Sequence, residues 1–196
     1  MFNKKLAIIG ASGAVGRVFI ELLDEMYPGN KDLFLVASKR SAGKSMLCGK
    51  EEFLIQDIED FDFSQVDIAF FSAGAETAEK YAPIAVSQGC TVIDNSSQFR
   101  TDSDKPLIVP EVNSRDLKDF KLPGIIANPN CSTAQLVVAL KPIHDLFKIE
   151  RVDVASYQSV SGTGKEGIDE LLEQTENFLN KKEIKPKVYG AQIAVS

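Results

Sequence analysis

The sequence predicts an α/β fold in which a parallel β-sheet is covered by helices on both faces. Short apolar runs rich in β-branched residues alternate along the chain with segments that have the period of an amphipathic helix. Most positions of the runs are apolar, which is typical of parallel strands buried on both faces. With 196 residues, 44% of them hydrophobic, the chain is long enough to bury a large core.

Six apolar runs predict the strands of this sheet. They are Leu6–Ile9, Leu33–Ala37, Ile68–Phe71, Thr91–Ile93, Leu107–Val109 and Ile125–Ala127. A later segment, Arg151–Val160, instead alternates apolar and polar side chains, as a half-exposed antiparallel strand does.

Four segments have the spacing of helices. They are Val15–Met26, Ala75–Gln88, Ser132–Phe147 and Lys165–Lys182. In the first, one apolar stripe is expected from Val15, Val18, Phe19, Leu22, Leu23 and Met26. Gly89 suits a left-handed C-cap for the second helix, and Pro142 is expected to kink or break the third.

These patterns divide the chain into two domains. Residues 1–131 form the parallel-sheet domain, and residues 132–196 begin an α+β domain, with the boundary between Cys131 and Ser132. The pattern changes again after Lys148, where alternation replaces the apolar runs.

Composition and charge argue against several functional classes. The net charge of −6 is spread along the chain, which argues against a nucleic-acid partner. No run approaches the 18 apolar residues of a membrane span, and the first residues do not resemble a secretory signal, so we expect a cytoplasmic protein. Three cysteines and one histidine without metal-ligand spacing predict neither a disulfide framework nor a metal site.

A glycine-rich loop, Gly10-Ala11-Ser12-Gly13-Ala14-Val15-Gly16, follows the first predicted strand and opens the first helix. Glycines let the backbone approach a pyrophosphate, whose charge the N–H groups of a helix N-terminus stabilise. The alternative is a tight turn without a ligand. Because strand, loop and helix occur in this order, we predict a Rossmann-type dinucleotide site formed by Gly10, Ser12, Gly13, Ala14, Val15 and Gly16.

The end of the second predicted strand indicates which dinucleotide binds. No acidic residue is present there to bind the ribose 2′-hydroxyl of NAD. Arg40 can instead offer a planar fork to a 2′-phosphate, and Ser38 or Ser41 can donate a further hydrogen bond. We therefore predict NADP, whereas Lys39 and Lys44 are equally well explained as solvated loop residues.

Cys131 is the candidate nucleophile. It lies between the last predicted strand and a helix, where the positive end of the helix dipole favours a thiolate. An adjacent backbone N–H and the Asn130 amide could stabilise an oxyanion formed on attack at a carbonyl. The alternative is a small buried cysteine, which is our interpretation of Cys48 and Cys90.

A nucleophilic cysteine beside a nicotinamide implies a reaction class. The thiolate adds to an aldehyde, hydride passes to NADP⁺, and a second nucleophile captures the resulting thioester. In the reverse direction, the same chemistry reduces an acyl phosphate.

Seven motifs in one order resemble the aspartate-semialdehyde dehydrogenase family, over essentially the whole chain. They are Gly10–Gly16, Ser38–Gly43, Phe71–Gly74, Asp94–Arg100, Pro110–Asn113, Asn128–Thr133 and Tyr157–Gly164. N-acetyl-γ-glutamyl-phosphate reductases share the architecture and remain an alternative. The residues flanking Cys131 and the Asn-Ser-Ser-x-Phe-Arg segment resemble the aspartate enzymes.

The resemblance implies a role for individual residues. Cys131 matches the acyl-thioester nucleophile, Gln158 the glutamine that holds the substrate near it, and Arg100 the phosphate-binding arginine. Arg40 and Ser41 match the 2′-phosphate corner. The turn under the nicotinamide is matched by Ser161 and Gly162, whose roles, like that of Gln158, rest on resemblance alone.

The activity implied is NADPH-dependent reduction of L-aspartyl 4-phosphate to L-aspartate 4-semialdehyde. The product leads to lysine, through diaminopimelate, and to threonine and methionine. The resemblance also implies a homodimer or tetramer for the complete enzyme.

The family's histidine and its carboxylate-binding arginine, both downstream of the cysteine, are not matched here. His144 lies within the helix that follows Cys131, roughly 20 Å along its axis, so we expect it to act only locally at the helix end. We therefore expect this chain to be the N-terminal part of the enzyme. The alternative is a non-catalytic NADP-binding module.

Overall fold

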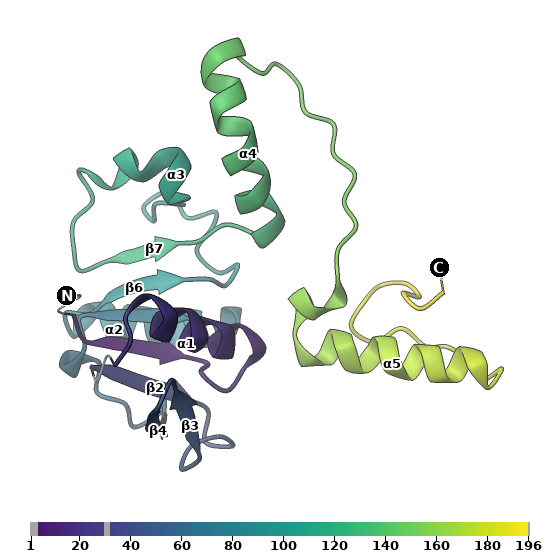
Figure 1. Ribbon diagram of the computed structural model, residues 1–196, viewed down its shortest axis with the longest axis horizontal. Helices are drawn as coiled ribbons and strands as arrows, with labels where there is room; N and C mark the ends of the chain where they lie inside the picture. Colours follow the sequence, from purple (N-terminus) through teal and green to yellow (C-terminus); the bar gives the residue numbers. More distant parts are fainter. Residues whose placement is uncertain (1–3, 30–31, 196) are drawn as a thin grey trace. The chain divides into compact units, whose positions relative to one another are not determined.

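The computed structural model describes residues 4–29 and 32–195. The chain forms two compact units, Met1–Glu150 and Arg151–Ser196 (Figure 1). The helix that begins at Cys131 is part of the first unit by this division. Compactness alone does not locate a functional boundary, so the boundary predicted at Cys131 stays a prediction.

Within the described residues of the first unit, seven strands form one sheet in the order β3-β4-β2-β1-β5-β6-β7. The five strands that pair in parallel around its centre were all predicted: β1 (Leu6–Ile9), β2 (Leu33–Ala37), β5 (Ile68–Phe71), β6 (Thr91–Asp94) and β7 (Ile125–Ala127). The direction of winding reverses at β1, which lies between β2 and β5. The predicted doubly wound sheet is confirmed.

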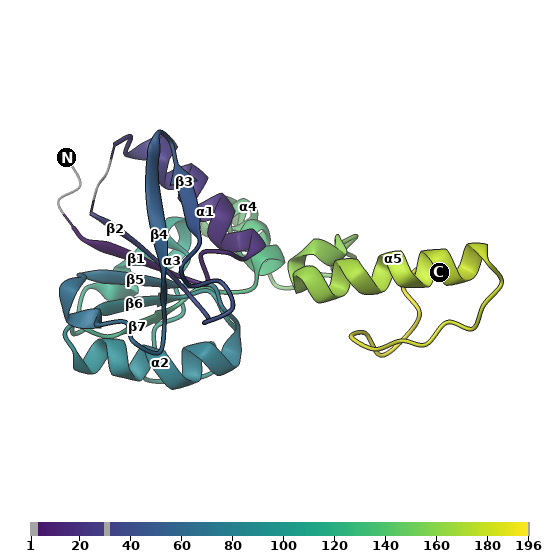
Figure 2. The same ribbon diagram turned by 90° about the horizontal axis from the view of Figure 1, so that it is seen from below.

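Helices α1 (Ala14–Met26) and α2 (Ala75–Ser87) lie on opposite faces of this sheet (Figure 2). The side chains of β1 alternate between two hydrophobic clusters. Ala7 and Ile9 join the cluster of α2, whereas Leu6 and Ile8 join the cluster that includes Ile20 of α1. Burial on both faces explains why β1 is apolar at every position.

The predicted helix ends are partly confirmed. Gly89 follows α2 with φ +92°, as expected of a left-handed C-cap. Pro142 does not break α4, which runs from Cys131 to Phe147. The last predicted helix is α5 (Lys165–Leu179), and short helical turns occur at α3 (Pro110–Asn113), η1 (Phe63–Gln65), η2 (Ser114–Leu117) and η3 (Val160–Thr163).

Only two of the six residues of the predicted apolar stripe of α1 pack against the core. Phe19 and Leu23 pack against the core, and Ile20 between them is buried. The other members of the stripe are exposed: Val15, Val18, Leu22 and Met26. The predicted helix is confirmed, but its buried face is rotated from the predicted stripe toward Gly16 and Ile20.

Two strands at the sheet edge were missed. β3 (Ser45–Cys48) and β4 (Glu51–Asp57) form an antiparallel hairpin, and β4 also pairs in parallel with β2. Their polar, partly exposed sequences lack the continuous apolar run that identified the central strands. The hairpin follows the predicted 2′-phosphate corner directly.

The strand predicted at Leu107–Val109 is wrong. Only one isolated bridge, from Leu107 to Ala127, forms there. Pro106 and Pro110 flank the segment and have no N–H to donate, so a longer ladder cannot form.

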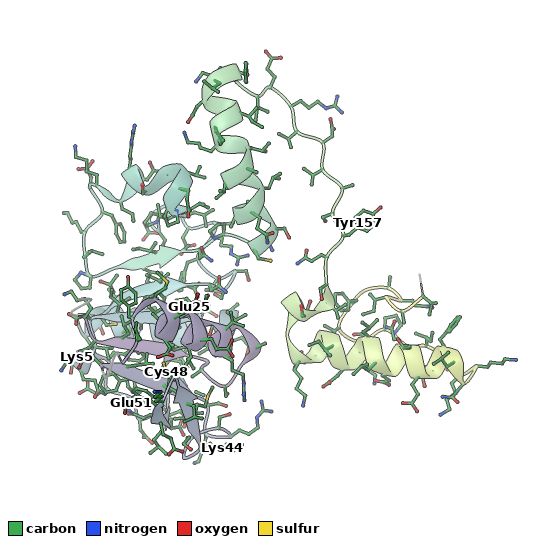
Figure 3. All side chains as sticks on the ribbon, viewed as in Figure 1. Lys5, Glu25, Lys44, Cys48, Glu51 and Tyr157 are labelled. Carbon is green, nitrogen blue, oxygen red and sulfur yellow. The ribbon has the colours of Figure 1, made fainter. Side chains whose placement is uncertain are left out.

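The strand predicted at Arg151–Val160 is also wrong. Residues 151–159 do not form a strand, and none of the described strands forms a β-ladder with them. The Tyr157 side chain is fully exposed (Figure 3). Alternation of polar and apolar residues shows only that one side could be buried, whereas a strand also requires a hydrogen-bonding partner.

In the second unit, two buried polar side chains of α5 hold the chain that follows it. Glu170 accepts hydrogen bonds from the main-chain N–H groups of Lys187, Val188 and Tyr189. Gln174 accepts from the N–H groups of residues 193 and 194, and its own amide donates to Glu170 at 2.7 Å. The segment 187–194 is thus fixed by side chains rather than by a β-ladder.

Candidate active site

The candidate residues of the first unit follow the carboxyl ends of parallel strands. Because parallel strands point the same way, their following loops meet at one edge of the sheet. The glycine-rich loop follows β1, and the Ser38–Ser41 turn follows β2. Asn95 follows β6 and Asn128 follows β7, in a register that pairs Asp94 with Ala127.

The glycine-rich loop lies close to its neighbours and leaves no room for side chains at two positions. A Cβ atom at Gly16 would collide with the main chain of Gly10 and Ala11. At Gly10, which has φ +89°, a Cβ would lie 3.0 Å from Ala73 in the loop after β5. α1 begins after Gly13, which has no side chain to cap the helix, so backbone N–H groups face this loop.

Ser12 and Ser41 connect the glycine-rich loop to the turn after β2. Ser12 Oγ donates to Ser41 Oγ at 3.0 Å, and Ser41 is buried. The turn itself is held by the N–H of Ser41, which donates to the Ser38 oxygen. Arg40 lies in the same turn and is exposed, so its guanidinium is accessible to the 2′-phosphate of a cofactor, as the predicted role requires.

Cys131 is exposed and is the first residue of α4. The Asn130 side-chain oxygen accepts hydrogen bonds from the N–H groups of Ser132 (3.0 Å) and Thr133 (3.3 Å). These backbone donors are therefore occupied by the helix cap. The cap uses only the oxygen of the Asn130 side chain, so its amide nitrogen could donate to an oxyanion near Cys131, a role that stays a prediction.

Arg100 is held by main-chain oxygens of two different loops. Its Nε donates to the oxygen of Asn128 at 2.9 Å, and one terminal nitrogen donates to the oxygen of Asn95 at 3.0 Å. A guanidinium has five N–H groups, so the remaining ones can bind an anion. The Arg100 side chain is partly buried. It contacts Asn128, which precedes Cys131 by three residues in the chain.

A buried carboxylate supports the loop that carries Arg100. Asp94 is completely buried and accepts from the N–H (3.0 Å) and the hydroxyl (2.7 Å) of Ser96. Burial raises the pKa of Asp94, and the hydrogen bonds from Ser96 and the charge of Arg100 oppose this. The hydroxyl of Ser96 in turn accepts from the N–H of Gln98.

The other two cysteines differ from Cys131. Cys48 and Cys90 are buried, and burial raises the pKa of both thiols, that of Cys90 to about 12. A buried thiol with a raised pKa is unreactive, which agrees with their interpretation as core residues.

Three predicted residues lie in the second unit: Ser161 and Gly162 in η3, and Gln158 just before it. Gln158 packs against Gly162, since a Cβ at that glycine would lie 3.3 Å from Gln158 Nε2. The Ser161 hydroxyl is 3.0 Å from that of Ser159. Gln158 also lines a cavity of about 400 Å³ with Tyr189 and Gln192.

Sequence reasoning missed several polar residues near these groups. Tyr189, whose hydroxyl is 2.6 Å from that of Thr163, and Gln192 line the cavity beside Gln158. Asn95 and Asn128 contact Arg100. The sequence could have indicated Asn95 and Asn128, because each is the first residue after a parallel strand, where binding residues of such sheets occur.

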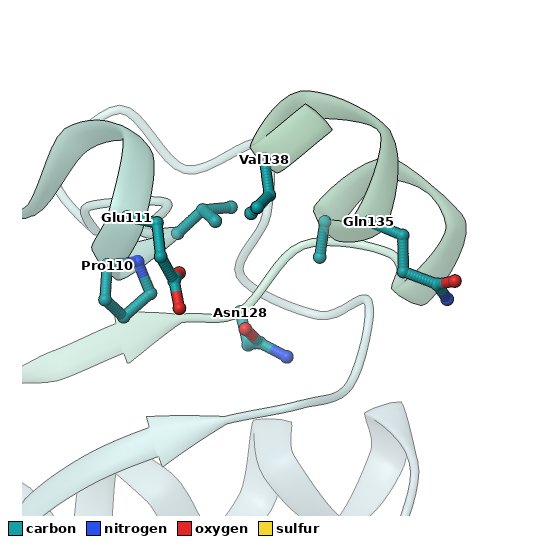
Figure 4. Close-up of a pocket in the computed structure, with 7 residues that line it drawn as sticks. Pro110, Glu111, Asn128, Gln135 and Val138 are labelled. Carbon is teal, nitrogen blue, oxygen red and sulfur yellow. The ribbon is translucent and has the colours of Figure 1, made fainter. Parts of the chain in front are cut away.

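A second cavity, of about 530 Å³, lies between α3 and α4 (Figure 4). Its apolar lining includes Val109 and Val138, and its polar lining residues are Glu111, Asn128 and Gln135. Asn128 therefore lines this cavity and also contacts Arg100.

His144 lies in the last turn of α4 and is exposed, and its main-chain oxygen accepts from the N–H of Lys148. The continuous helix between it and Cys131 agrees with the expected local role. In residues 4–29 and 32–195, no group of His, Cys, Asp or Glu side chains is arranged to hold a metal ion. No helix in these ranges is long and apolar enough to cross a membrane.

Comparison with known families matches both parts of the chain. The sequence model described as "Semialdehyde dehydrogenase, NAD binding domain" matches residues 5–120, more than half of the chain. The chain belongs to the semialdehyde dehydrogenase family. The family's dimerisation domain matches residues 140–196.

Relatives within the family are similar along nearly the whole chain. A Shewanella protein named aspartate-semialdehyde dehydrogenase is 53% identical over 189 residues, which cover 96% of this chain and 56% of the relative. Aspartate-semialdehyde dehydrogenase 2 of Vibrio cholerae is 52% identical over the same shares. The chain thus spans a little more than half the length of these relatives.

Solved structures of family members have the same fold. Aspartate semialdehyde dehydrogenase II of Vibrio cholerae superimposes with a TM-score of 0.89 at 51% identity, covering 98% of this chain and 58% of that one. A further structure of that enzyme, described as complexed with ASA, has a TM-score of 0.88 and covers 97% and 57%. The Candida albicans enzyme, solved with NADP, has a TM-score of 0.61 at 31% identity, covering 74% and 48%.

Proposed function

We propose that the protein containing this chain reduces L-aspartyl 4-phosphate to L-aspartate 4-semialdehyde with NADPH. The observation that carries the proposal is the juxtaposition of Arg100 with the segment that leads to Cys131, in a member of the semialdehyde dehydrogenase family. A guanidinium hydrogen-bonded to the segment that leads to an exposed cysteine suits an acyl phosphate, because the carbonyl carbon and the phosphate of such a substrate lie a few atoms apart.

Cys131 attacks the acyl carbon in this proposal. The thiolate forms a C–S bond, the bond between the acyl carbon and the phosphate oxygen breaks, and inorganic phosphate leaves with the electron pair. The Asn130 amide donates a hydrogen bond to the oxyanion, and Arg100 holds the phosphate. Cys131 is released as a thiolate when the reduced intermediate collapses to the aldehyde.

NADPH, when bound, supplies the hydride that reduces the thioester. The residues of the first unit fit such a cofactor, because no side chain caps the N-terminus of α1 at Gly13, where backbone N–H groups can bind a pyrophosphate. Arg40 and Ser41 hold the 2′-phosphate, and Ser12 orients Ser41 through their hydrogen bond. Ser161 and Gly162 form the turn under the nicotinamide, and Gln158 orients the substrate.

The product places this reaction in amino-acid biosynthesis, on the route to lysine, threonine and methionine. We propose that the protein acts in the cytoplasm and forms a homodimer or tetramer through the domain that begins near residue 140. No nucleic acid or membrane takes part in this function.

Turnover and cofactor binding together test the proposal. For the protein that contains this chain, we expect saturable NADPH binding and NADPH oxidation that depends on aspartyl phosphate, with the Vibrio cholerae enzyme as the positive control. NADPH binding without turnover would support the binding-module alternative for this chain. Preference for N-acetyl-glutamyl phosphate would identify the reductase of arginine synthesis instead.

Residue variants refine this test. Cys131→Ser should retain NADPH affinity and lower turnover by on the order of a thousandfold, because an alcohol at this position is a far weaker nucleophile. Cys48→Ser is the matched control and should leave turnover within about threefold of the unchanged protein. Undiminished turnover in Cys131→Ser would contradict the proposed mechanism.

A further inference from the structure

The side chains of Asn95 and Asn128 bridge the two loops that hold Arg100. Asn128 Nδ2 donates to Asn95 Oδ1 at 2.6 Å. The same two residues present the main-chain oxygens that accept from the Arg100 guanidinium. Arg100, Asn95 and Asn128 therefore contact one another in all three pairs, through two hydrogen bonds to main-chain oxygens and one between side chains.

The sheet fixes the backbone on both sides of this bridge. The N–H of Asn95 donates to the Phe71 oxygen at 2.9 Å, and the N–H of Asn128 donates to the Asp94 oxygen at 2.8 Å. Beyond these bonds the parallel ladder ends, because β6 and β7 stop at Asp94 and Ala127. The peptide group after Asn128 is oriented by the side-chain bridge and by Arg100, whereas the one after Asn95 is also held by the Ser96 N–H, which donates to Asp94.

The Asn128 loop leads directly to the nucleophile. Pro129 is buried, Asn130 caps α4 with its side chain, and Cys131 is the first helical residue. These contacts leave little freedom between Asn128 and Cys131. A rotation of the Asn128 peptide would therefore change the position of Arg100 relative to Cys131.

We propose that the Asn95–Asn128 hydrogen bond is a positioning contact that sets the distance between the Arg100 guanidinium and Cys131. The inference deepens the proposed function and rests on it, since it assigns the pair to phosphate and acyl-phosphate binding. Neither asparagine touches the reacting atoms in this role. Each acts through Arg100.

The effect of the Asn95–Asn128 hydrogen bond on Arg100 can be distinguished from an effect on the stability of the fold. Asn95 is exposed and Asn128 is partly buried, and an amide–amide hydrogen bond that solvent can reach adds little to stability. Removing it should thus change the orientation of Arg100 more than the unfolding temperature. Asn113 is a suitable comparison, because its side chain also makes hydrogen bonds within the first unit, to Val109 and Leu107, without contacting Arg100.

The first measurement is hydrogen exchange of the Arg100 Nε–H by nuclear magnetic resonance, with the signal assigned by its loss in Arg100→Lys. In the unchanged chain this proton donates to Asn128 and should exchange slowly. Asn95→Ala and Asn128→Ala should each raise its exchange rate by about threefold to tenfold, and the double variant should raise it no further. Asn113→Ala should leave the rate unchanged.

The second measurement is binding of inorganic phosphate, followed as protection of Cys131 from iodoacetamide. Both alanine variants should weaken phosphate binding by about threefold to tenfold, with NADPH affinity unchanged within about twofold. In the protein that turns over, the KM for the acyl phosphate should rise by a similar factor with a smaller change in kcat.

Conservative variants test the polarity of the bond. Asn95→Asp retains an oxygen acceptor for Asn128 and should keep the Arg100 proton protected. Asn128→Leu has a similar size but neither a donor nor an acceptor, and it should lose that protection. These variants keep side-chain size, so they remain informative if an alanine variant fails to fold.

Two results would overturn the inference. One is unchanged Arg100 exchange in both alanine variants, and the other is unchanged phosphate binding in them while Arg100→Lys weakens it. Failure of the proposed function has a different signature. In that case the unchanged chain would not bind phosphate at Arg100, whereas the exchange rates would still show whether the pair orients the guanidinium.

Discussion

Ser12 and Ser41 lie 29 positions apart in the chain, and their hydroxyl groups are 3.0 Å apart. The first belongs to the glycine-rich loop after β1, and the second to the turn after β2 that also carries Arg40. One hydrogen bond therefore joins the proposed pyrophosphate site to the proposed 2′-phosphate site.

Replacement of Arg40 should change cofactor selectivity. Arg40→Ala removes a guanidinium fork from the 2′-phosphate and should weaken NADPH binding by about 10-fold to 100-fold. NADH has no such phosphate, so its affinity should stay within about twofold. Fluorescence titration with both cofactors measures this ratio.

Lys39→Ala provides the matched control, because Lys39 is a cation of the same exposed turn. It should have a smaller effect than Arg40→Ala. An equal loss of NADPH and NADH affinity in Arg40→Ala would place the 2′-phosphate elsewhere.

An alanine at Gly16 should disrupt the glycine-rich loop. The added Cβ would collide with the main chain of Gly10 and Ala11, which cannot move without displacing the loop. We expect Gly16→Ala to lower the free energy of unfolding by about 1 to 3 kcal/mol and to weaken NADPH binding. Urea denaturation and cofactor titration measure the two effects.

Gly190→Ala is the control for this variant, since nothing lies within 4 Å of a Cβ at Gly190. It should change neither quantity appreciably. Unchanged stability and cofactor affinity in Gly16→Ala would contradict this expectation, because the main chain of Gly10 and Ala11 would then have moved without a cost.

Alkylation under native conditions should distinguish the three cysteines. Cys131 is exposed, whereas Cys48 and Cys90 are buried and burial raises the pKa of both thiols. Iodoacetamide near neutral pH should therefore modify Cys131 alone, and mass spectrometry should find a single modified site. Comparable labelling of Cys90 before unfolding would contradict the described core.

Glu170 should make the second unit sensitive to acid. Burial raises the pKa of Glu170, but hydrogen bonds from the N–H groups of Val188, Lys187 and Tyr189 outweigh it and hold the pKa below its ordinary value. The stabilisation is therefore complete above the unfolded pKa of about 4.3, and it is lost as the pH falls through the lower folded pKa.

Thermal unfolding at a series of pH values tests this expectation. Glu170→Gln should remove the part of the acid dependence that arises from this carboxylate and should lower the unfolding temperature at pH 7. Glu183→Gln is the exposed control and should leave the curve unchanged. Identical pH profiles for Glu170→Gln and the unchanged chain would contradict the assignment.

The central sheet could be predicted because its strands are buried on both faces. In β1 all four side chains are buried, so the apolar run marks the strand without reference to its neighbours. The hairpin of β3 and β4 is an edge structure whose stability comes from pairing, and pairing leaves little trace in a single partly polar segment. The same limit explains the wrong strand at Arg151–Val160.

The candidate site was predictable where one residue type is chemically required. Cys131 and Arg40 stand out because few side chains provide a nucleophile or a planar cation beside a nucleotide loop. Their supporting residues were not predictable in the same way. Asn95 and Asn128 are separated by 33 positions, and only the register of β6 with β7 brings their amides together.

The contact between Gly10 and Ala73 has a consequence for natural variation. A Cβ at the glycine would lie 3.0 Å from the alanine, so the two loops have no spare volume between them. Enlargement of either residue would require a compensating change at the other, and Gly10 is already the smallest residue possible. Position 73 should therefore stay small throughout evolution wherever position 10 keeps its close approach.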